Sequence, residues 1–119
     1  MKAALKLSLL AGLISSSSVM AADKVTFQLD WLPGGDKAPV YVGIQEGFFA
    51  EADLDVSIAS GRGSTEALTK MATGQSDVGS SDIGALMAAK AQDGVPVVAI
   101  YPYFTQAPHA FFALKSSGI

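Results

Sequence analysis

The stretch VTFQLDWLPGGDKAPVYVGIQEG, residues 25–47, decides the fold because it predicts a strand, a turn and a helix in succession. Apolar side chains occupy every second position across residues 25–31, which is typical of a β-strand. Residues 33–35, Pro-Gly-Gly, then predict a turn, with Asp36 as the N-cap of the following helix. Ligands of open α/β sheets bind beyond the carboxyl ends of the strands, so residues 30–35 are the first candidate site.

The rest of the chain repeats this design. After the turn, Val40, Ile44 and Phe48 recur every four residues and predict one buried stripe, and Gly47 predicts the end of the helix. Apolar runs predict further strands, and helical periodicity predicts further helices: strands 54–58, 77–80, 95–101 and 110–114, and helices 64–74 and 83–92. The order β-α-β-α-β-α-β-β predicts a layered α/β domain whose sheet is mostly parallel.

Composition excludes several classes of chemistry. The 119 residues contain 8 basic and 11 acidic side chains, one histidine and no cysteine. A disulfide, a thiolate zinc site, a cysteine nucleophile and a multi-histidine metal site are therefore excluded within this chain. The acidic pI of about 4.8 and the scarcity of clustered basic residues argue against nucleic acid as a partner.

Residues 1–21 have the pattern of a secretory signal peptide. Two lysines precede an apolar run at residues 7–14, and Val19-Met20-Ala21 permits cleavage after Ala21. A retained membrane anchor is the alternative, but the apolar run is shorter than the roughly 20 residues that span a bilayer. Residues 22–119 then form the folded part, with 6 basic against 11 acidic residues, and we expect it in a bacterial periplasm.

A parallel sheet brings four loops to one edge: residues 30–35, 61–64, 80–82 and 101–106. The second loop, Gly61-Arg62-Gly63-Ser64, would offer backbone N–H groups and a guanidinium to an anion, or it is only a glycine turn with an exposed arginine. It matches neither nucleotide-binding glycine pattern. Ser80, Ser81 and Asp82 either bind a ligand or only cap the helix after them.

The remaining candidates carry a carboxylate or an aromatic ring. Asp30 would accept an N–H group of a ligand, or it only satisfies backbone groups. Trp31, Tyr101, Tyr103 and Phe104 would stack on a flat ring, or they pack in the core. We interpret His109 as a structural or surface residue. The pattern G-x-S-x-G is absent and no carboxylate pair suggests acid–base catalysis, so we expect a site that binds, with no catalytic residue, cofactor or metal.

Read together, several motifs resemble those of the extracytoplasmic solute-binding proteins of ABC importers. The motifs are L-D-W-x-P-G-G, Y-V-G-I-x-E-G-F-F, L-D-V-x-I, G-R-G-S, G-x-S-D-V-G and G-V-P-V. The branch most similar to residues 25–119 binds or makes the thiamine pyrimidine precursor and includes binders of nitrate, sulfonates and taurine. The resemblance implies a periplasmic-binding-protein type II-like fold, of which this chain supplies part of the first three-layer lobe while the second lobe is absent.

The resemblance also implies a cleft, a partner and a function. Trp31, Pro33, residues 61–64 and residues 80–82 would line the cleft, and a membrane permease would receive the solute. Lys37 stands near the place where the pyrimidine branch commonly carries a histidine, which leaves anionic solutes open. A synthase that makes the pyrimidine from pyridoxal phosphate is the alternative from another class, and a sensor domain is a third. We expect a solute-binding protein that is not an enzyme, because the synthases carry a cysteine-rich motif and lack a signal peptide.

Overall fold

A computed structural model describes residues 21–106 and 110–118. The helices and strands within this part are β1 (Asp23–Gln28), η1 (Gly35–Lys37), α1 (Ala38–Gln45), η2 (Ala50–Ala52), β2 (Leu54–Ala59), α2 (Ser64–Ala72), β3 (Val78–Gly79), α3 (Ile83–Asp93) and η3 (Lys115–Ser117). Residues 1–20, which include most of the expected signal peptide, and His109 lie outside the described residues. No helix in the described ranges has the length and apolarity that crossing a membrane requires.

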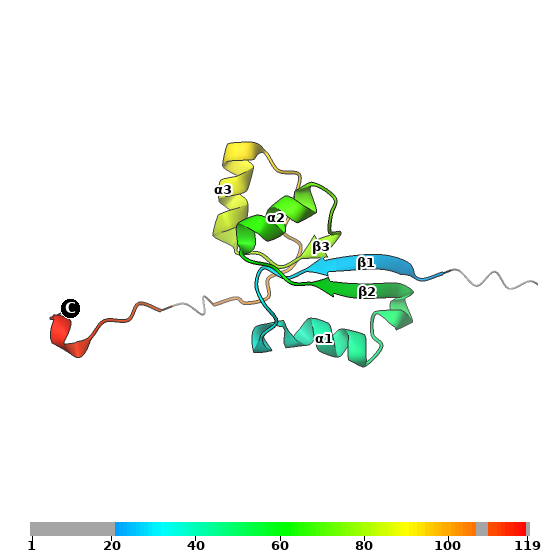
Figure 1. Ribbon diagram of the computed structural model, residues 1–119, viewed down its shortest axis with the longest axis horizontal. Helices are drawn as coiled ribbons and strands as arrows, with labels where there is room; N and C mark the ends of the chain where they lie inside the picture. Colours follow the sequence, from blue (N-terminus) through cyan, green and yellow to red (C-terminus); the bar gives the residue numbers. More distant parts are fainter. Residues whose placement is uncertain (1–20, 107–109, 119) are drawn as a thin grey trace, which may run out of the picture.

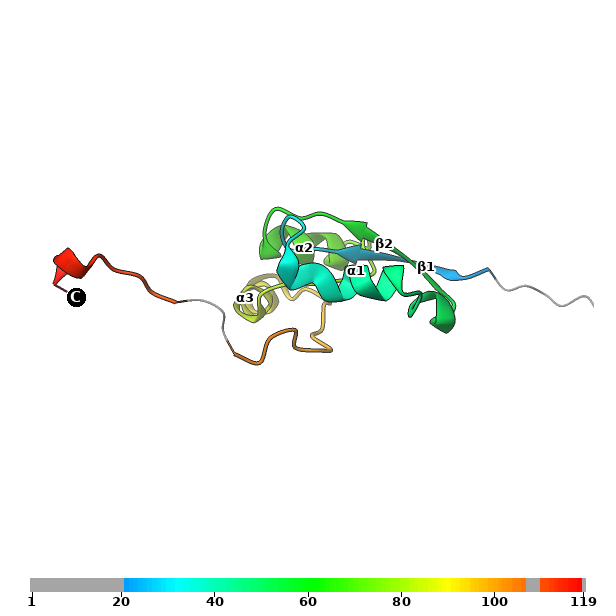
Figure 2. The same ribbon diagram turned by 90° about the horizontal axis from the view of Figure 1, so that it is seen from below.

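β1 is the middle strand of a three-stranded sheet with the order β2-β1-β3. Both pairings are parallel, and Phe27 lies opposite Ile58 on one side and Val78 on the other. Helix α1 covers one face of the sheet, and α2 and α3 cover the opposite face (Figures 1 and 2). The prediction of a layered α/β lobe with a parallel sheet is therefore confirmed, and the carboxyl ends of all three strands meet at one edge.

Local signals placed several helix ends correctly. α1 ends at Gln45, and Gly47 follows with a φ of +80°, which only glycine adopts readily. Asp82 caps α3, because its Oδ1 accepts a hydrogen bond from the N–H of Ala85 at 3.1 Å. The prediction of Asp36 as an N-cap is wrong, since this residue lies inside η1 and makes no capping hydrogen bond.

The buried core is small. Its apolar members are Leu29, Val40, Ala67, Leu68 and Leu86. The predicted stripe on α1 is wrong beyond its first member, because Ile44 and Phe48 are 39% and 60% exposed. The sheet side of α1 instead has Gly43 against the ring of Phe49.

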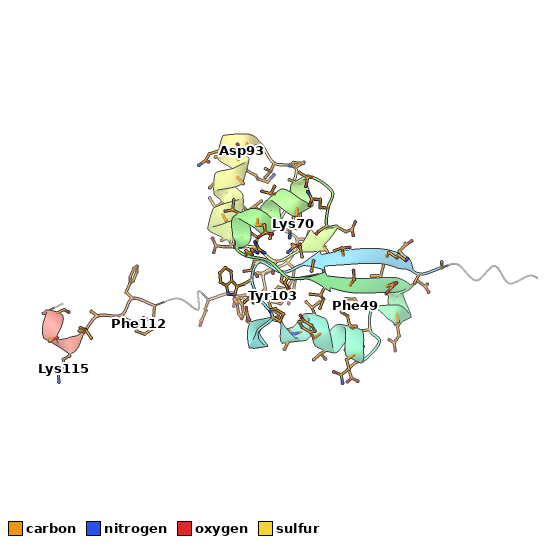
Figure 3. The ribbon with its side chains drawn as sticks, in the orientation of Figure 1. Phe49, Lys70, Asp93, Tyr103, Phe112 and Lys115 are labelled. Carbon is orange, nitrogen blue, oxygen red and sulfur yellow. The ribbon has the colours of Figure 1, made fainter. Side chains whose placement is uncertain are left out.

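Two predicted strands are absent from the described residues. Residues 95–101 and 110–114 form no strand, and Val98 and Ile100 are 69% and 80% exposed. Apolar residues form a strand only beside a partner, and β3 offers an edge of only two residues. Residues 110–118 extend away from the sheet, and Phe112 lies far from the packed helices (Figure 3).

The first strand ends at Gln28, earlier than the predicted end at Trp31. The cause is the loop after β2, which takes over the backbone groups that would continue the strand. Gly61 N–H donates to the Trp31 carbonyl at 3.2 Å, and Gly63 N–H donates to the Asp30 carbonyl at 2.7 Å. These bonds direct residues 30–32 away from the ladder of the sheet, at the edge where the carboxyl ends of the strands meet.

Candidate functional site

A cavity of about 1070 Å³ lies at the carboxyl edge of the sheet, and we call it the site cavity. Each of the four loops expected at this edge contributes to its wall. The polar and aromatic residues that matter below are Asp30, Asp36, Lys37, Ser64, Ser80, Ser81, Asp82, Tyr101 and Tyr103. Residues that are far apart in the sequence thus border one space, as the parallel sheet requires.

Asp30 is the centre of the polar wall. Its Oδ1 contacts Lys37 Nζ at 2.6 Å and accepts a hydrogen bond from Ser80 Oγ at 2.8 Å. Its backbone N–H donates to Ser80 Oγ at 3.2 Å, so Ser80 holds both the main chain and the side chain of this residue. Both side-chain contacts converge on Oδ1, and the second oxygen, Oδ2, makes no hydrogen bond or ion pair with another side chain of the described residues.

Asp30, Lys37 and Asp36 form one cluster of charges, in which each ionised side chain stabilises the charge of its partner. Burial alone would raise the pKa of Asp30, but hydrogen bonds from Lys37 and Ser80 and the charge of Lys37 outweigh it and lower the pKa. Burial likewise opposes the charge of Lys37, but the carboxylates of Asp30 and Asp36 raise its pKa. Asp36 Oδ2 lies 2.8 Å from Lys37 Nζ. Two anions and one cation therefore give the group a net negative charge at neutral pH.

Ser64 and Asp82 join the first turns of α2 and α3. The backbone N–H of Asp82 donates to Ser64 Oγ at 3.0 Å. A hydroxyl that accepts in this way keeps its own proton for another acceptor. Ser81 differs, because its hydroxyl donates to the Asp82 carbonyl at 3.3 Å. Of the three serines at the cavity, Ser64 is the one whose hydroxyl donates to no residue within the described ranges.

Five candidate residues from the sequence do not line the site cavity: Trp31, Pro33, Gly61, Arg62 and Gly63. Trp31 is 57% exposed. Gly61 is buried, and a Cβ there would overlap the Leu29 carbonyl oxygen, so close backbone approach explains this glycine. Arg62 is exposed. The structure thus brings together Asp30, Ser64, residues 80–82 and Tyr101, and leaves the other candidates beside the cavity.

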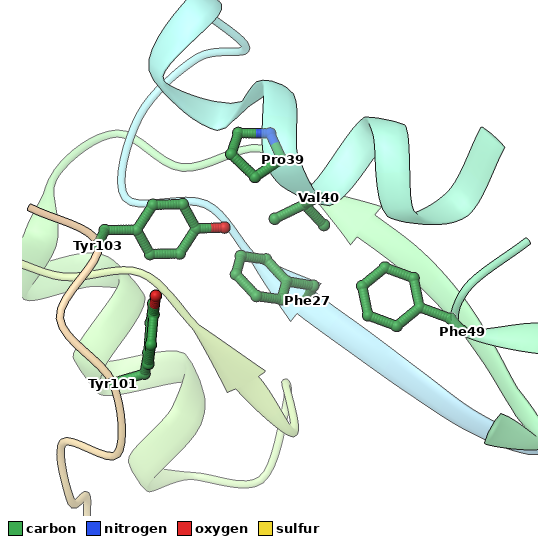
Figure 4. A pocket seen from close by; sticks show the side chains of 6 residues that line it. All are labelled: Phe27, Pro39, Val40, Phe49, Tyr101 and Tyr103. Atoms are coloured by element: carbon green, nitrogen blue, oxygen red, sulfur yellow. The ribbon is translucent and has the colours of Figure 1, made fainter. Parts of the chain in front are cut away.

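A second, apolar pocket of about 470 Å³ lies between α1 and the segment that carries the two tyrosines. Phe27 lies at its middle, with Phe49 on one side and Tyr103 on the other (Figure 4). Burial raises the pKa of Tyr103, against the opposing charge of Lys37. Tyr101 and Tyr103 line both the apolar pocket and the site cavity, whereas Phe104 lines only the site cavity.

Two residues in or under the site were not among the candidates from the sequence. Lys37 follows the turn and was considered only for its position, yet its exposed fraction is 8% and it pairs with two carboxylates. Gln28 is wholly buried at the end of β1. Gln28 falls on the polar side of the alternation in this strand, together with Thr26 and Asp30, so the local pattern gave no signal that it is buried. In the described parts of the chain, no group of three or more His, Cys, Asp or Glu side chains has a geometry that suits a metal ion.

Comparison with known proteins identifies relatives of this chain. A 4-amino-5-hydroxymethyl-2-methylpyrimidine phosphate synthase of Saccharomyces cerevisiae, THI11, is 30% identical over 100 residues, which are 84% of this chain and 29% of the relative. The synthase of the same name from Legionella pneumophila is 32% identical over 96 residues, 81% of this chain and 30% of the relative. The chain thus spans less than a third of these relatives. No solved structure shows significant similarity.

These relatives correct one expectation. The prediction that the protein is not an enzyme is wrong by this comparison, because the curated proteins that match most of the chain are named as synthases. The prediction rested on the absence of cysteine and on the signal-peptide pattern of residues 1–21. The model of the family described as NMT1/THI5 like matches residues 35–119, and the chain belongs to that family.

Proposed function

We propose that the site cavity binds an aminopyrimidine phosphate, and that the whole protein is a synthase of the 4-amino-5-hydroxymethyl-2-methylpyrimidine phosphate named in its relatives. The observation that carries the proposal is the state of Asp30. Lys37 and Ser80 keep its carboxylate ionised and occupy only Oδ1. Oδ2 is then a strong acceptor for the exocyclic amino group of such a ring, because hydrogen bonds to an ionised group are roughly twice as strong as neutral ones.

Ser64 supplies the complementary donor. Its hydroxyl accepts from Asp82 and so turns its proton toward an acceptor atom of a ligand in the cavity. An aminopyrimidine presents both an N–H donor and ring-nitrogen acceptors. Tyr101 and Tyr103 border the same space and offer aromatic faces to the ring. One acceptor, one donor and flanking rings match this class of heterocycle.

The phosphate group belongs at the rim in this proposal. Arg62 is exposed, lies two residues before Ser64, where α2 begins, and makes no ion pair with a carboxylate in the described residues. A guanidinium beside the first N–H groups of a helix is favourable for a phosphate. The ring would therefore lie inside the cavity, with the phosphate directed outward.

Pyridoxal phosphate, the substrate of the alternative from the sequence, does not fit as a covalent partner of the described residues. An amine attacks an aldehyde only after losing its proton. Lys37 is the lysine of the site cavity, and its two carboxylate partners raise its pKa, so it stays protonated at neutral pH. Lys37 thus serves here as the cation that holds Asp30, and no step through pyridoxal phosphate is derived.

A second candidate function is the capture of a solute for an ABC importer, with a membrane permease as partner. The signal-peptide pattern of residues 1–21 favours it, together with a periplasmic location. Nitrate, a sulfonate or taurine would suit this candidate less well than a pyrimidine that directs its phosphate outward, because the charge of such a small solute would lie inside the cavity, against a net negative polar wall. This importer function and the synthase share one ligand class and differ in turnover.

Calorimetric titration with 4-amino-5-hydroxymethyl-2-methylpyrimidine phosphate, its unphosphorylated form and taurine tests the proposal. We expect the phosphorylated pyrimidine to bind best, and Asp30→Asn to weaken binding about 10- to 100-fold, the worth of one charged hydrogen bond. Asp55→Asn on the exposed side of β2 is the matched control and should leave binding unchanged. Formation of the pyrimidine phosphate from pyridoxal phosphate, detected by mass spectrometry, supports the synthase. Binding of the pyrimidine without such formation supports the importer. Binding of taurine in place of either pyrimidine refutes both assignments of ligand.

A further inference from the structure

Gln28, the last residue of β1, is a polar side chain with an exposed fraction of 0%. Its Nε2 donates to three backbone carbonyls: Leu29 at 2.9 Å, Ala59 at 3.3 Å and Ser60 at 3.0 Å. Its Oε1 accepts a hydrogen bond from Ser76 Oγ at 3.3 Å. One buried amide therefore connects the middle strand with the loop after β2 and with the turn before β3.

The bond to Ser60 is the informative one. The Ala59 carbonyl already accepts from the Leu29 N–H at 2.8 Å, as the sheet ladder requires, so it does not depend on Gln28. Ser60 is exposed, and its carbonyl has water as an alternative partner. The Gly61 N–H of the same peptide donates to the Trp31 carbonyl at 3.2 Å, so the Gln28 amide holds the carbonyl side of a peptide whose N–H side is bound to the segment after β1. The amide thus selects one orientation of the peptide that begins the loop.

The loop that starts at this peptide forms one side of the candidate site. Its next bonds, Gly61 N–H to the Trp31 carbonyl and Gly63 N–H to the Asp30 carbonyl, attach it to the end of β1. It then delivers Ser64 to the site cavity. The orientation of the Ser60 peptide consequently sets where this hydroxyl lies relative to the carboxylate of Asp30.

We propose that Gln28 is a positioning residue, which fixes the Ser60 peptide and so holds the loop of residues 61–64 at its working distance from Asp30. It touches no ligand itself. The inference rests on the proposed function in one respect, namely that Ser64 and Arg62 contact acceptor atoms of the ligand. The positioning of the loop can be measured without any ligand.

Amide hydrogen exchange followed by NMR tests the ligand-free part. Gln28→Met keeps the length of the side chain and removes its donors, and we expect exchange at Gly61 and Gly63 to accelerate about tenfold more than at the amides of β2. Ser76→Ala is the matched control, because it removes the hydrogen bond to the oxygen of the same amide. In that variant, exchange at the two glycines should accelerate no more than exchange at the amides of β2. Equal acceleration of loop and strand in Gln28→Met overturns the proposal.

A measurement on the unaltered protein covers the case in which Gln28→Met does not fold. The side-chain amide protons of Gln28 should exchange much more slowly than those of Gln92, which is exposed at the end of α3. They should also show nuclear Overhauser contacts to Ser60. Exchange as fast as that of Gln92 would show that the amide is not bound as described and would reject the role.

Ligand affinity separates positioning from simple stabilisation. In Gln28→Met, the preference for the phosphorylated over the unphosphorylated pyrimidine should fall about tenfold, because the loop that meets the phosphate is displaced. An equal loss of affinity for both compounds indicates a structural role only and contradicts the proposal. If the unaltered protein binds neither compound, the proposed function fails, while the exchange measurements still decide the role of Gln28.

Discussion

The ion pair between Asp30 and Lys37 should be strongly coupled, and a double-mutant cycle measures how strongly. At the observed 2.6 Å, Coulomb's law with an effective dielectric constant near 20 gives roughly 6 kcal/mol of attraction. Desolvation cancels much of this, since the two side chains are only 25% and 10% exposed. We expect a net coupling free energy of about 2 kcal/mol between the two residues.

The single substitutions should differ in cost. Lys37→Met leaves the carboxylates of Asp30 and Asp36 facing each other without their cation, so it should lower the free energy of unfolding by about 3 kcal/mol. Asp30→Asn leaves Lys37 paired with Asp36 and should cost about 1 kcal/mol. The double variant should lose about 2 kcal/mol, less than the sum of the single losses, because it removes both partners.

Urea denaturation followed by circular dichroism gives the four free energies of the cycle. The pair Glu66–Lys70 on α2 is a matched control, with a similar distance of 2.8 Å but greater exposure, 37% and 29%. A more exposed pair four residues apart on a helix should show a much smaller coupling, because solvent screens its charges. A coupling for Asp30–Lys37 as small as that of this control would refute the claim that burial strengthens the pair and keeps Asp30 ionised.

Four further predictions concern packing and the dependence of stability on pH. Gly61→Ala should lower the free energy of unfolding by about 3 kcal/mol through overlap with backbone, whereas Gly35→Ala, with open space at its Cβ, should change it by less than about 0.5 kcal/mol in the same urea assay. Leu68→Ala should cost about 3 kcal/mol because this side chain is only 3% exposed, and a loss below about 1 kcal/mol would show that α2 is not packed as described. The stabilisation by ionised Asp30 should be present above its ordinary pKa of 3.8 and be lost as pH falls through the lowered pKa of the folded state, so Asp30→Asn should flatten the acid limb of a stability–pH curve. The raised pKa of Lys37 predicts a loss at the alkaline end, as pH rises through the folded-state pKa above 10.5, and Lys37→Met should remove that limb.

Local sequence patterns were sufficient for most of the sheet and for several helix ends. Alternation in residues 54–58 predicts β2 because the side-chain period of a strand is a property of the backbone. Gly47 and Gly94 end their helices because positive φ is costly for other residues. Such features depend on neighbours within a few positions, which a single sequence displays directly.

The failures share a different cause. The run at residues 95–101 is apolar enough for a buried strand, but a strand also requires an edge to pair with, and β3 provides only two residues. Lys37 reaches Asp30 only because the turn folds back over the end of β1. Gln28 meets Ser76 across 48 positions. Contacts between distant segments are decided by tertiary packing, and no local pattern contains them.

The position of β1 explains why one strand organises both sides of the candidate site. As the middle strand, it has a neighbour on each side, and its last residue, Gln28, lies two positions before Asp30. Gln28 binds the peptide of Ser60 after β2, and Asp30 binds the hydroxyl of Ser80 after β3. A residue in an edge strand could orient only one such loop. The polar side chains at the end of this strand therefore cost burial energy in the core and, in return, hold the loops that follow both neighbouring strands.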